Sequence, residues 1–323
     1  MAKKLIITGV AALIIIMALC GCGSSAKKPF QNMPDINPKA ESANKDTVNV
    51  ALYYCYNGER LLASETRAIE VPVNDSLEAA VVRAIIAGPS AEMDELSGLF
   101  WDGVKLIRVD SNADIFFVTL SEEFITTTPA AAVLDEPNTQ ERKKLAIYSI
   151  VNTIVEMGKF SRVQVYVDRQ GGVGQRITLV EAGWSDENTT HLEPLPRNQS
   201  IILTPQNTLV QALDSYSKKD WTRLYDFTAY MSKDGSIKPD ITDFSAALAA
   251  TGNVLDSFFV TDANVSLSGQ SAVVMLDYTL STREGDSVTR SGIPVVLVRE
   301  HEIWKLTYAS LVDVLINVGY RYG

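Results

Sequence analysis

An α+β fold in two domains is the architecture that the sequence predicts. The chain has 323 residues, and at ~150 residues per domain this length fits about two domains. Strand-like and helix-like periodicities alternate in residues 47–185, whereas a group of helices precedes a group of long strands in residues 204–317. The 46% of hydrophobic residues and the 21% of charged residues are ordinary for a globular protein. We therefore expect two folded domains, joined by a linker at residues 186–203.

The first domain is expected to follow the order β-β-α-β-β-α-β-β. Strand 47–56 places alternate side chains, from Val48 to Tyr56, on one face. Asp75-Ser-Leu-Glu78 resembles a capping box that opens the first helix, and Gly88-Pro89 ends this helix. The other expected elements are strands 67–73, 104–109, 115–120, 162–167 and 175–180, and a second helix 141–157. Together they predict one small sheet with both helices on one face.

Helices come first in the second domain, and strands follow. Thr204-Pro205 starts a helix, because threonine caps a first turn and proline is favoured at its first position. Asp220 caps a short helix, and Asp240 starts a third helix that Gly252 ends. A turn at Gly285-Asp286 separates the middle pair of four expected strands, which are 258–267, 271–282, 288–299 and 303–311.

The first 22 residues have the pattern of an export signal. Lys3 and Lys4 form a basic start, and an almost unbroken apolar run extends from Leu5 to Leu19. A helix that spans a bilayer needs ~20 apolar residues, so this run is short for an anchor and suits a cleaved signal. An uncleaved signal anchor remains the alternative.

The apolar run ends in Leu19-Cys20-Gly21-Cys22, which resembles the lipobox of bacterial lipoproteins. The resemblance implies that Cys22 receives a diacylglycerol thioether and becomes the mature N-terminus. The lipid would hold the protein on the outer face of the cytoplasmic membrane, because two acyl chains give stable anchoring. Cys20 is the alternative lipidation site, but it would need cleavage after the bulky Leu19.

A flexible tether is expected at residues 23–46. This stretch contains Pro29, Pro34 and Pro38, several Asn and Lys residues and few apolar ones, so it cannot build a core. A flexible coil of this length spans about 27 Å as a root mean square. The folded domains can therefore stand clear of the lipid headgroups.

The charge excludes one class of partner. The chain has 39 acidic and 29 basic residues, for a formal net charge of −10, and signal cleavage removes two lysines more. Phosphates attract a basic surface, so nucleic acid is not expected as a partner. Two histidines and three cysteines are too few and too scattered for a structural zinc site, and no metal or cofactor is expected.

Several strings in the first domain resemble the GerMN domain of sporulation and spore germination proteins. In this order and spacing, the strings lie at residues 48–54, 65–67, 77–89, 116–124, 146–154 and 163–168. The resemblance implies a non-enzymatic envelope domain, similar in fold to the ring-building motifs of secretion complexes. It also implies two such domains in tandem, but the second half of this chain does not repeat the strings. Asn152, inside one string, is expected to bond a neighbouring loop.

The second domain resembles the nuclear-transport-factor-2-like cone fold. The residues that carry this resemblance are 212–221 and 224–227 in the helices, and 293–299 and 303–306 in the last strands. The resemblance implies helices packed against a curved antiparallel sheet. Because this fold hosts enzymes, ligand cups and interaction modules, it does not determine the function.

Catalytic patterns are not found in the sequence. His301-Glu302 lacks the second histidine of a zinc protease helix, and Gly171–Gly174 lacks the lysine of a phosphate loop and reads as a hairpin turn. Asp277-Tyr278 could mimic an isomerase pair inside a cone, but adjacent strand residues face opposite sides, which favours a structural role. Cys55 is expected to be a small core residue. We therefore expect no enzyme and no catalytic residue.

Two functions remain as expectations. The first is a membrane-anchored scaffold or assembly lipoprotein, linked to sporulation or spore germination, that binds envelope protein partners. The alternative is an accessory lipoprotein of a sensor or transporter, with the cone as a ligand cup. The polar stretch from Thr126 to Asn138, and exposed strand edges, are the candidate partner sites.

Overall fold

The computed structural model describes residues 47–126, 139–169, 171–232 and 235–317. The expected signal peptide, the tether and Cys22 lie outside the described residues, and so does the stretch from 127 to Asn138. In the part of the chain that is described, no helix is both long and apolar enough to cross a membrane.

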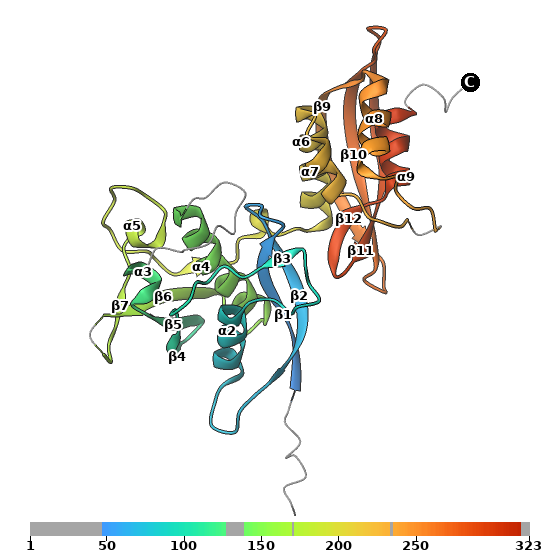
Figure 1. Ribbon diagram of the computed structural model, residues 1–323. Helices are drawn as coiled ribbons and strands as arrows, with labels where there is room; N and C mark the ends of the chain where they lie inside the picture. The colour runs from blue at the N-terminus through green and yellow to red at the C-terminus, as the bar shows by residue number, and fades with distance from the viewer. Residues whose placement is uncertain (1–46, 127–138, 170, 233–234, 318–323) are drawn as a thin grey trace, which may run out of the picture. The chain divides into compact units, whose positions relative to one another are not determined.

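The first three strands form a small antiparallel sheet with β1 at its centre. They are β1 (Thr47–Tyr56), β2 (Leu62–Glu70) and β3 (Leu96–Ser97), in the order β2-β1-β3. Strand β2 pairs with β1 from Thr47 to Cys55, whereas β3 pairs only with Cys55 and Tyr56. Among the described residues, the first half of β1 therefore has a strand on one side only (Figure 1).

A second sheet has the order β4-β5-β6-β7, and a fifth strand, β8, also pairs with β6. These strands are β4 (Leu106–Asn112), β5 (Ile115–Ser121), β6 (Arg162–Asp168), β7 (Gly174–Arg176) and β8 (Leu195–Pro196). Strands β5 and β6 run parallel, and the other pairs run antiparallel. The sequence predicted one sheet here, and this detail was wrong. At Tyr53 a helix takes the place of a further strand beside β1, since Thr153 of that helix accepts the N–H of Tyr53.

Two long helices pack against both sheets of the first domain. They are α2 (Leu77–Ala87) and α4 (Thr139–Glu156), and the short α3 (Glu123–Thr126) precedes α4. Ser76 caps α2, one residue later than the capping box predicted, and Gly88 ends it at a φ of 94°. From Leu145 to Ile154 every residue of α4 except Tyr148 is buried, so this helix is enclosed on all sides and not on the one face that its periodicity predicted.

The expected closing strand 175–180 is cut short. Strand β7 ends at Arg176, and a helical turn α5 (Leu179–Ala182) follows. The cause is a capping box, because the hydroxyl of Thr178 accepts from the N–H of Glu181 while the Glu181 carboxylate accepts from Thr178. Apart from this and the short additional elements, the predicted element order is confirmed.

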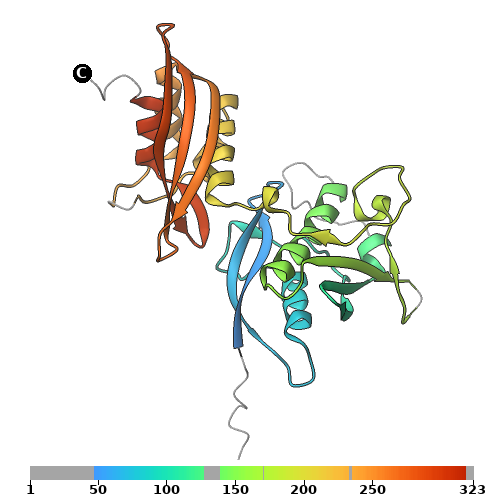
Figure 2. The same ribbon diagram turned by 180° about the vertical axis from the view of Figure 1, so that it is seen from behind.

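The second domain has helices packed on one face of a curved antiparallel sheet, as predicted (Figures 1 and 2). The helices are α6 (Pro205–Lys218), α7 (Trp221–Asp226) and α8 (Ile241–Thr251), with Thr204, Asp220 and Asp240 as N-caps. The strands are β9 (Val254–Val265), β10 (Ser271–Ser281), β11 (Ser287–Glu300) and β12 (Ile303–Leu306). The expected strand 303–311 ends early, because Thr307 caps the helix α9 (Tyr308–Leu311), which continues into the π-helix η2 (Val312–Ile316).

The stretch expected as a linker, 186–203, packs on the first domain. It contains β8 and the 3₁₀-helix η1 (Gln199–Ile201), and the N–H of Leu203 bonds the carbonyl of Leu62. Residues from Asp46 onward form one compact unit, within which Arg223 donates to Glu59 at 2.5 and 3.1 Å. The predicted boundaries at 185 and 204, and the independence of the two domains, stay predictions.

Candidate functional site

The first half of β1 presents an open backbone edge. The N–H groups of Tyr53 and Asn57 leave the strand on the side away from β2, where they bond Thr153 and Glu95. Because backbone groups alternate sides along a strand, the N–H and C=O of Asn49 and Ala51 face that side as well. No described residue pairs with these four groups. They form a ready template for one more strand.

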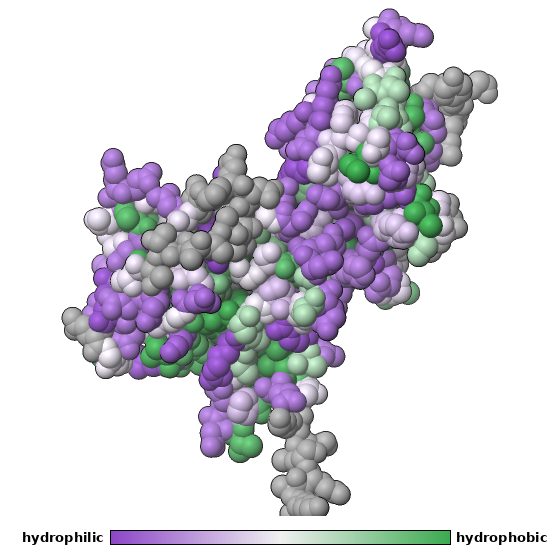
Figure 3. Space-filling model, viewed as in Figure 1, coloured by the Kyte–Doolittle hydropathy of each residue, from purple (hydrophilic) through white to green (hydrophobic). Residues whose placement is uncertain are grey.

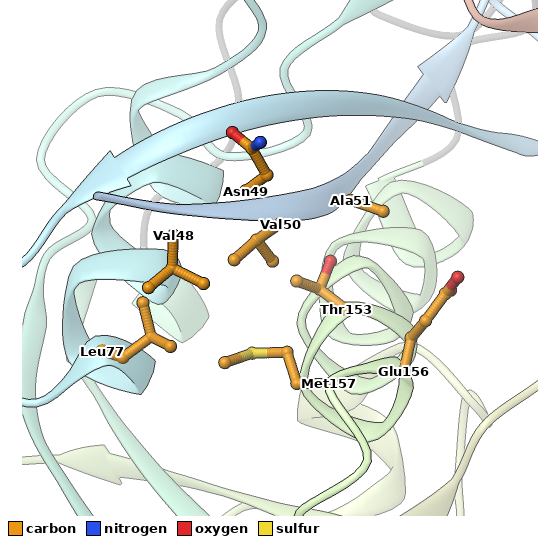
Figure 4. Close-up of a pocket in the computed structure, with 8 residues that line it drawn as sticks. All are labelled: Val48, Asn49, Val50, Ala51, Leu77, Thr153, Glu156 and Met157. Atoms are coloured by element: carbon orange, nitrogen blue, oxygen red, sulfur yellow. The ribbon is translucent and has the colours of Figure 1, made fainter. Parts of the chain in front are cut away.

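A groove of about 220 Å³ lies beside this open edge. Val48 and Val50 of β1 point toward Leu77 of α2 and Met157 after α4, and Asn49 points away from them (Figure 4). Val50 is buried, whereas Val48 is 39% exposed. The groove thus offers an apolar floor below an unpaired backbone, which is how an added strand is held in β-augmentation.

Two ion pairs involve Glu156, which lines this groove, and Glu78, the neighbour of Leu77 in the sequence. Arg197 donates to Glu156 and to the phenol of Tyr53, both at 3.0 Å, and the same phenol donates to Glu156. Lys159 pairs with Glu78 at 2.7 Å. Both carboxylates next to the groove therefore have a cationic partner. The groove is better suited to a neutral, extended segment than to a charged small molecule.

The long edge strand of the second domain is arranged differently. Strand β9 is the outer strand of its sheet, and Phe259 on it is 66% exposed. However, its register with β10 shifts at two places, and an exposed acidic residue lies at each, Asp256 and Asp262. Bulges and charges are the usual protection of an edge strand against pairing. Strand β1 has neither along residues 47–51.

A larger cavity of about 510 Å³ lies in the second domain. Its walls come from β10, β11, α9 and η2, and they carry hydroxyl, guanidinium and carboxylate groups. The polar lining residues are Tyr278, Thr289, Arg290, Ser291, Ser310, Asp313 and Asn317. Burial raises the pKa of the Tyr278 phenol, so this hydroxyl stays a hydrogen-bond donor at neutral pH. The cavity could hold a small polar ligand.

The residues that the sequence singled out for chemistry do not form a site. Asp277 accepts from the N–H of Gly292 at 2.6 Å, whereas Tyr278 is buried on the opposite face, as strand alternation predicted. His301 is exposed in the turn between β11 and β12. Cys55 is fully buried in the core, as predicted, and its thiol contacts the carbonyl of Glu59.

Metal ligands do not gather in the part of the chain that the structure describes: no group of three or more His, Cys, Asp or Glu residues there could hold a metal ion. The glycines near 172 form the β6–β7 turn, where Asp168 accepts from the N–H groups of Gly171 and Gly172. The surface drawn in Figure 3 is largely hydrophilic, with separate hydrophobic patches.

Two of the strings that carry the resemblance meet in space. The carboxylate of Glu65 is 5% exposed and accepts from Arg67 at 2.6 and 3.0 Å. It also accepts from the N–H and the hydroxyl of Ser90, and Arg67 donates to the carbonyl of Gly88. These residues therefore fix β2 to the end of α2, which is a structural role.

The Asn152 prediction is confirmed by its contacts. Its side chain accepts from the N–H of Asn198 at 2.8 Å and donates to the carbonyl of the same residue at 3.2 Å. The loop that precedes the second domain is thus held on α4.

Exposed strand edges were predicted as candidate partner sites, but neither the edge of β1 nor the groove beside it was singled out. Strand alternation correctly placed Val48 and Val50 on the core side, but it contains no information on how far β3 extends along β1. The lengths of the two strands, ten residues in β1 and two in β3, come from the structure, and no strand was predicted at the position of β3. Because β3 is so much shorter than β1, part of the edge of β1 is uncovered.

Comparison with known proteins finds one family model that is similar to part of the first domain. The family model for Germane, described as sporulation and spore germination, matches residues 51–171. No protein of curated function matches the chain.

Three solved structures resemble parts of the chain. The tandem GerMN domains of the sporulation protein GerM from Bacillus subtilis are 18% identical, with a TM-score of 0.31, over 47% of this chain and 45% of that one. The chain thus spans less than half the length of that structure. A candidate lipoprotein from Clostridium perfringens is 20% identical, with a TM-score of 0.27, over 48% of this chain and 90% of that one.

A candidate dehydratase of the nuclear-transport-factor-2-like family from Streptomyces avermitilis is the third structure. It is 17% identical, with a TM-score of 0.21, over 32% of this chain and 95% of that one. The family match begins at Ala51 and ends in the β6–β7 turn, so it includes α2 and α4, whereas Val48, Asn49 and Val50 of the groove precede it. Residues 51–171 of this chain are thus similar to the Germane family, which is described as sporulation and spore germination.

Proposed function

We propose that this chain is a membrane-anchored scaffold that recruits an envelope protein through the groove beside β1. The open backbone at Asn49 and Ala51, above an apolar floor, is the observation that carries this proposal. The Germane match links the work of the domain to sporulation or germination. The mechanism is binding without turnover, and nucleic acid is not the partner because the chain is acidic.

The lipid at Cys22 is the second part of the proposal. It would hold the protein on the outer face of the cytoplasmic membrane and confine it to two dimensions. An integral membrane partner then meets the groove at a raised effective concentration, so a modest intrinsic affinity is enough for assembly. The apolar run before Cys22 and the lipobox pattern support this location.

Site-specific crosslinking tests the groove. A photoreactive amino acid is introduced at Asn49 in the lipidated protein, in sporulating cells, and a matched chain carries it at Val173. Val173 is 71% exposed but lies in the turn between β6 and β7, away from β1. We expect one specific protein adduct from position 49 and none from position 173. Adducts of equal pattern and yield at both positions would contradict the proposal.

A second candidate function rests on the cavity of about 510 Å³ in the second domain. Its hydroxyl and charged lining favours a small polar ligand, which would make the chain an accessory lipoprotein of a sensor or transporter. Tyr278→Phe and Ser291→Ala should then reduce the function in cells while abundance and melting temperature stay unchanged. Under the scaffold proposal the same variants act as wild type.

A further inference from the structure

We propose that a pocket on the second sheet of the first domain binds an α-amino acid, held by its two charges between Arg108 and Asp110. The inference goes beyond the proposed function, because it concerns a small ligand and a pocket that shares no lining residue with the groove beside β1. The pocket has a volume of about 310 Å³, and its lining residues are Arg108, Asp110, Phe117, Thr119, Tyr166 and Gly174.

The pocket lies on the face of the sheet that points away from the core. Val118 of β5 and Val165 of β6 are fully buried in the core of this domain. Side chains alternate along a strand, so their neighbours Thr119 and Tyr166 lie on the opposite face. The volume of the pocket is near the lower end for small-molecule sites, which suits a ligand as small as an amino acid.

A buried hydroxyl without a partner lines the pocket. Thr119 is 4% exposed, and its Oγ1 atom forms no hydrogen bond with a described residue. Buried hydroxyls normally have a partner, because burial takes them out of water. A ligand atom that accepts from Oγ1 would supply the partner that the described part of the chain does not provide.

Gly174 of β7 keeps this hydroxyl within reach of a ligand. A Cβ at position 174 would lie 2.7 Å from Oγ1 of Thr119 and 3.0 Å from Cβ of Tyr166. Any side chain there would therefore cover the hydroxyl and fill the space beside it. Glycine allows the backbone to approach closely and leaves this space empty.

Two opposite charges line the pocket without neutralising each other. Arg108 and Asp110 are two positions apart on β4, so both side chains lie on one face, with their Cα atoms ~6.8 Å apart. Neither forms an ion pair with a described residue, and Oδ1 of Asp110 accepts the N–H of Ser111 at 2.8 Å. An ion of one sign would be attracted by one of the two charges and repelled by the other, whereas a zwitterion pairs with both.

The cross-strand neighbours on β5 divide the pocket in the same way. Thr119 lies opposite Arg108 in the register, and Phe117 lies opposite Asp110. The carboxylate of an amino acid then accepts from the Arg108 guanidinium and from the Thr119 hydroxyl. Its ammonium group donates to the Asp110 carboxylate and lies beside the ring of Phe117, whose face attracts a cation.

Two aromatic rings are left to contact the side chain of the ligand. The ring centroids of Phe117 and Tyr166 are 5.8 Å apart, and the ring planes are tilted by 50°. Both residues are partly exposed, so an apolar group that packs on them removes apolar surface from water. The pocket therefore favours an amino acid with an apolar side chain, and leucine is a suitable probe.

A titration followed by amide NMR signals tests the proposal in the purified chain that begins at residue 23, at pH 7. The probes are leucine, 3-methylbutylamine, which lacks the carboxylate, and 4-methylpentanoate, which lacks the ammonium group. We expect leucine to shift the signals of β4 and β5 saturably, and to bind at least about tenfold more tightly than either analogue, because each analogue loses one charge-assisted pair.

Four variants separate the contributions of single groups. Arg108→Gln removes the guanidinium, and Arg162→Gln is its control, because Arg162 is an exposed arginine of β6 that does not line the pocket. Thr119→Val removes the hydroxyl, and Thr119→Ser keeps it. We expect leucine to bind about tenfold more weakly to Arg108→Gln and about fivefold more weakly to Thr119→Val, and the two controls to bind it like wild type.

Three results would overturn the inference. Leucine that causes no saturable shift in β4 and β5 means that the pocket takes no apolar amino acid. Equal affinity for leucine and 4-methylpentanoate means that the pocket holds an anion and not a zwitterion. Unchanged leucine binding by Arg108→Gln means that the ligand lies elsewhere. None of these measurements involves the groove beside β1, so the crosslinking experiment at position 49 can fail or succeed independently.

Discussion

Replacement of Arg67 by Met should strongly destabilise the first domain. Glu65 is 5% exposed, and Arg67 supplies two of its hydrogen bonds and its cationic partner. Without the guanidinium the carboxylate stays buried, with Ser90 alone as its donor among the contacts described above. Breaking one side of a buried ion pair costs about 3–5 kcal/mol of unfolding free energy.

The double variant isolates the cause of this loss. Glu65→Gln removes the buried charge and keeps an acceptor for Ser90. We therefore expect the variant with both Glu65→Gln and Arg67→Met to be more stable than Arg67→Met alone, by at least about 1 kcal/mol. Urea unfolding at pH 7 measures all three variants against wild type. An Arg67→Met loss below about 1 kcal/mol, or a double loss equal to the sum of the single losses, would refute the argument.

The pH dependence provides an independent check on the same pair. Burial opposes the charge of Glu65, but the hydrogen bonds from Arg67 and Ser90 outweigh it and lower the pKa of this carboxyl. The folded state then holds this proton less tightly than the unfolded chain does. The stabilisation is therefore present above the ordinary pKa of about 4.3 and is lost as the pH falls below it. Glu65→Gln should show a smaller loss of stability over that range.

Three further predictions concern other parts of the chain. Gly183→Ala should lower the free energy of unfolding by at least about 2 kcal/mol, because Gly183 has a φ of 87° and a Cβ there would collide with the carbonyl of Gln140. Gly171→Ala should lower it less in the same denaturation experiment, because φ is 75° there and no atom lies near. Burial lowers the pKa of Lys238 to about 8, so the unfolding free energy should rise between about pH 8 and 10, and a Lys238→Met variant that keeps this rise would contradict the assignment. Cys22→Ala should leave the protein unprocessed or released, and its retention on membranes after carbonate washing would indicate a signal anchor instead.

Local signals predicted most of the fold. The helix ends followed from caps, because Thr204, Asp220 and Asp240 each accept a backbone N–H in the first turn. The two strands that were predicted too long failed for the same local reason. Thr178 and Thr307 are β-branched and suit a strand, but their hydroxyls cap helical turns. The hydrogen bonds of these caps decide the local structure, and hydrophobic periodicity carries no information on them.

The candidate site depended on contacts between distant parts of the chain. Val48 and Met157 are far apart in sequence, and nothing in either segment indicates that α4 lies beside the edge of β1. The hydrogen bond from Tyr53 to Thr153, which fixes this arrangement, joins residues a hundred positions apart. By contrast, the structural roles of Asn152, Cys55 and Tyr278 followed from residue type and strand alternation.

A single surface substitution in cells tests the central claim most directly. Val48→Lys places a charge at the rim of the groove, where Val48 is 39% exposed, so the fold should tolerate it; Val173→Lys makes the same change at an exposed valine outside the groove. Sporulation and germination frequencies are measured in strains that contain equal amounts of each protein. We expect Val48→Lys to lose function and Val173→Lys to keep it. Wild-type frequencies with Val48→Lys would contradict the assignment of the groove beside β1 as the recruiting surface.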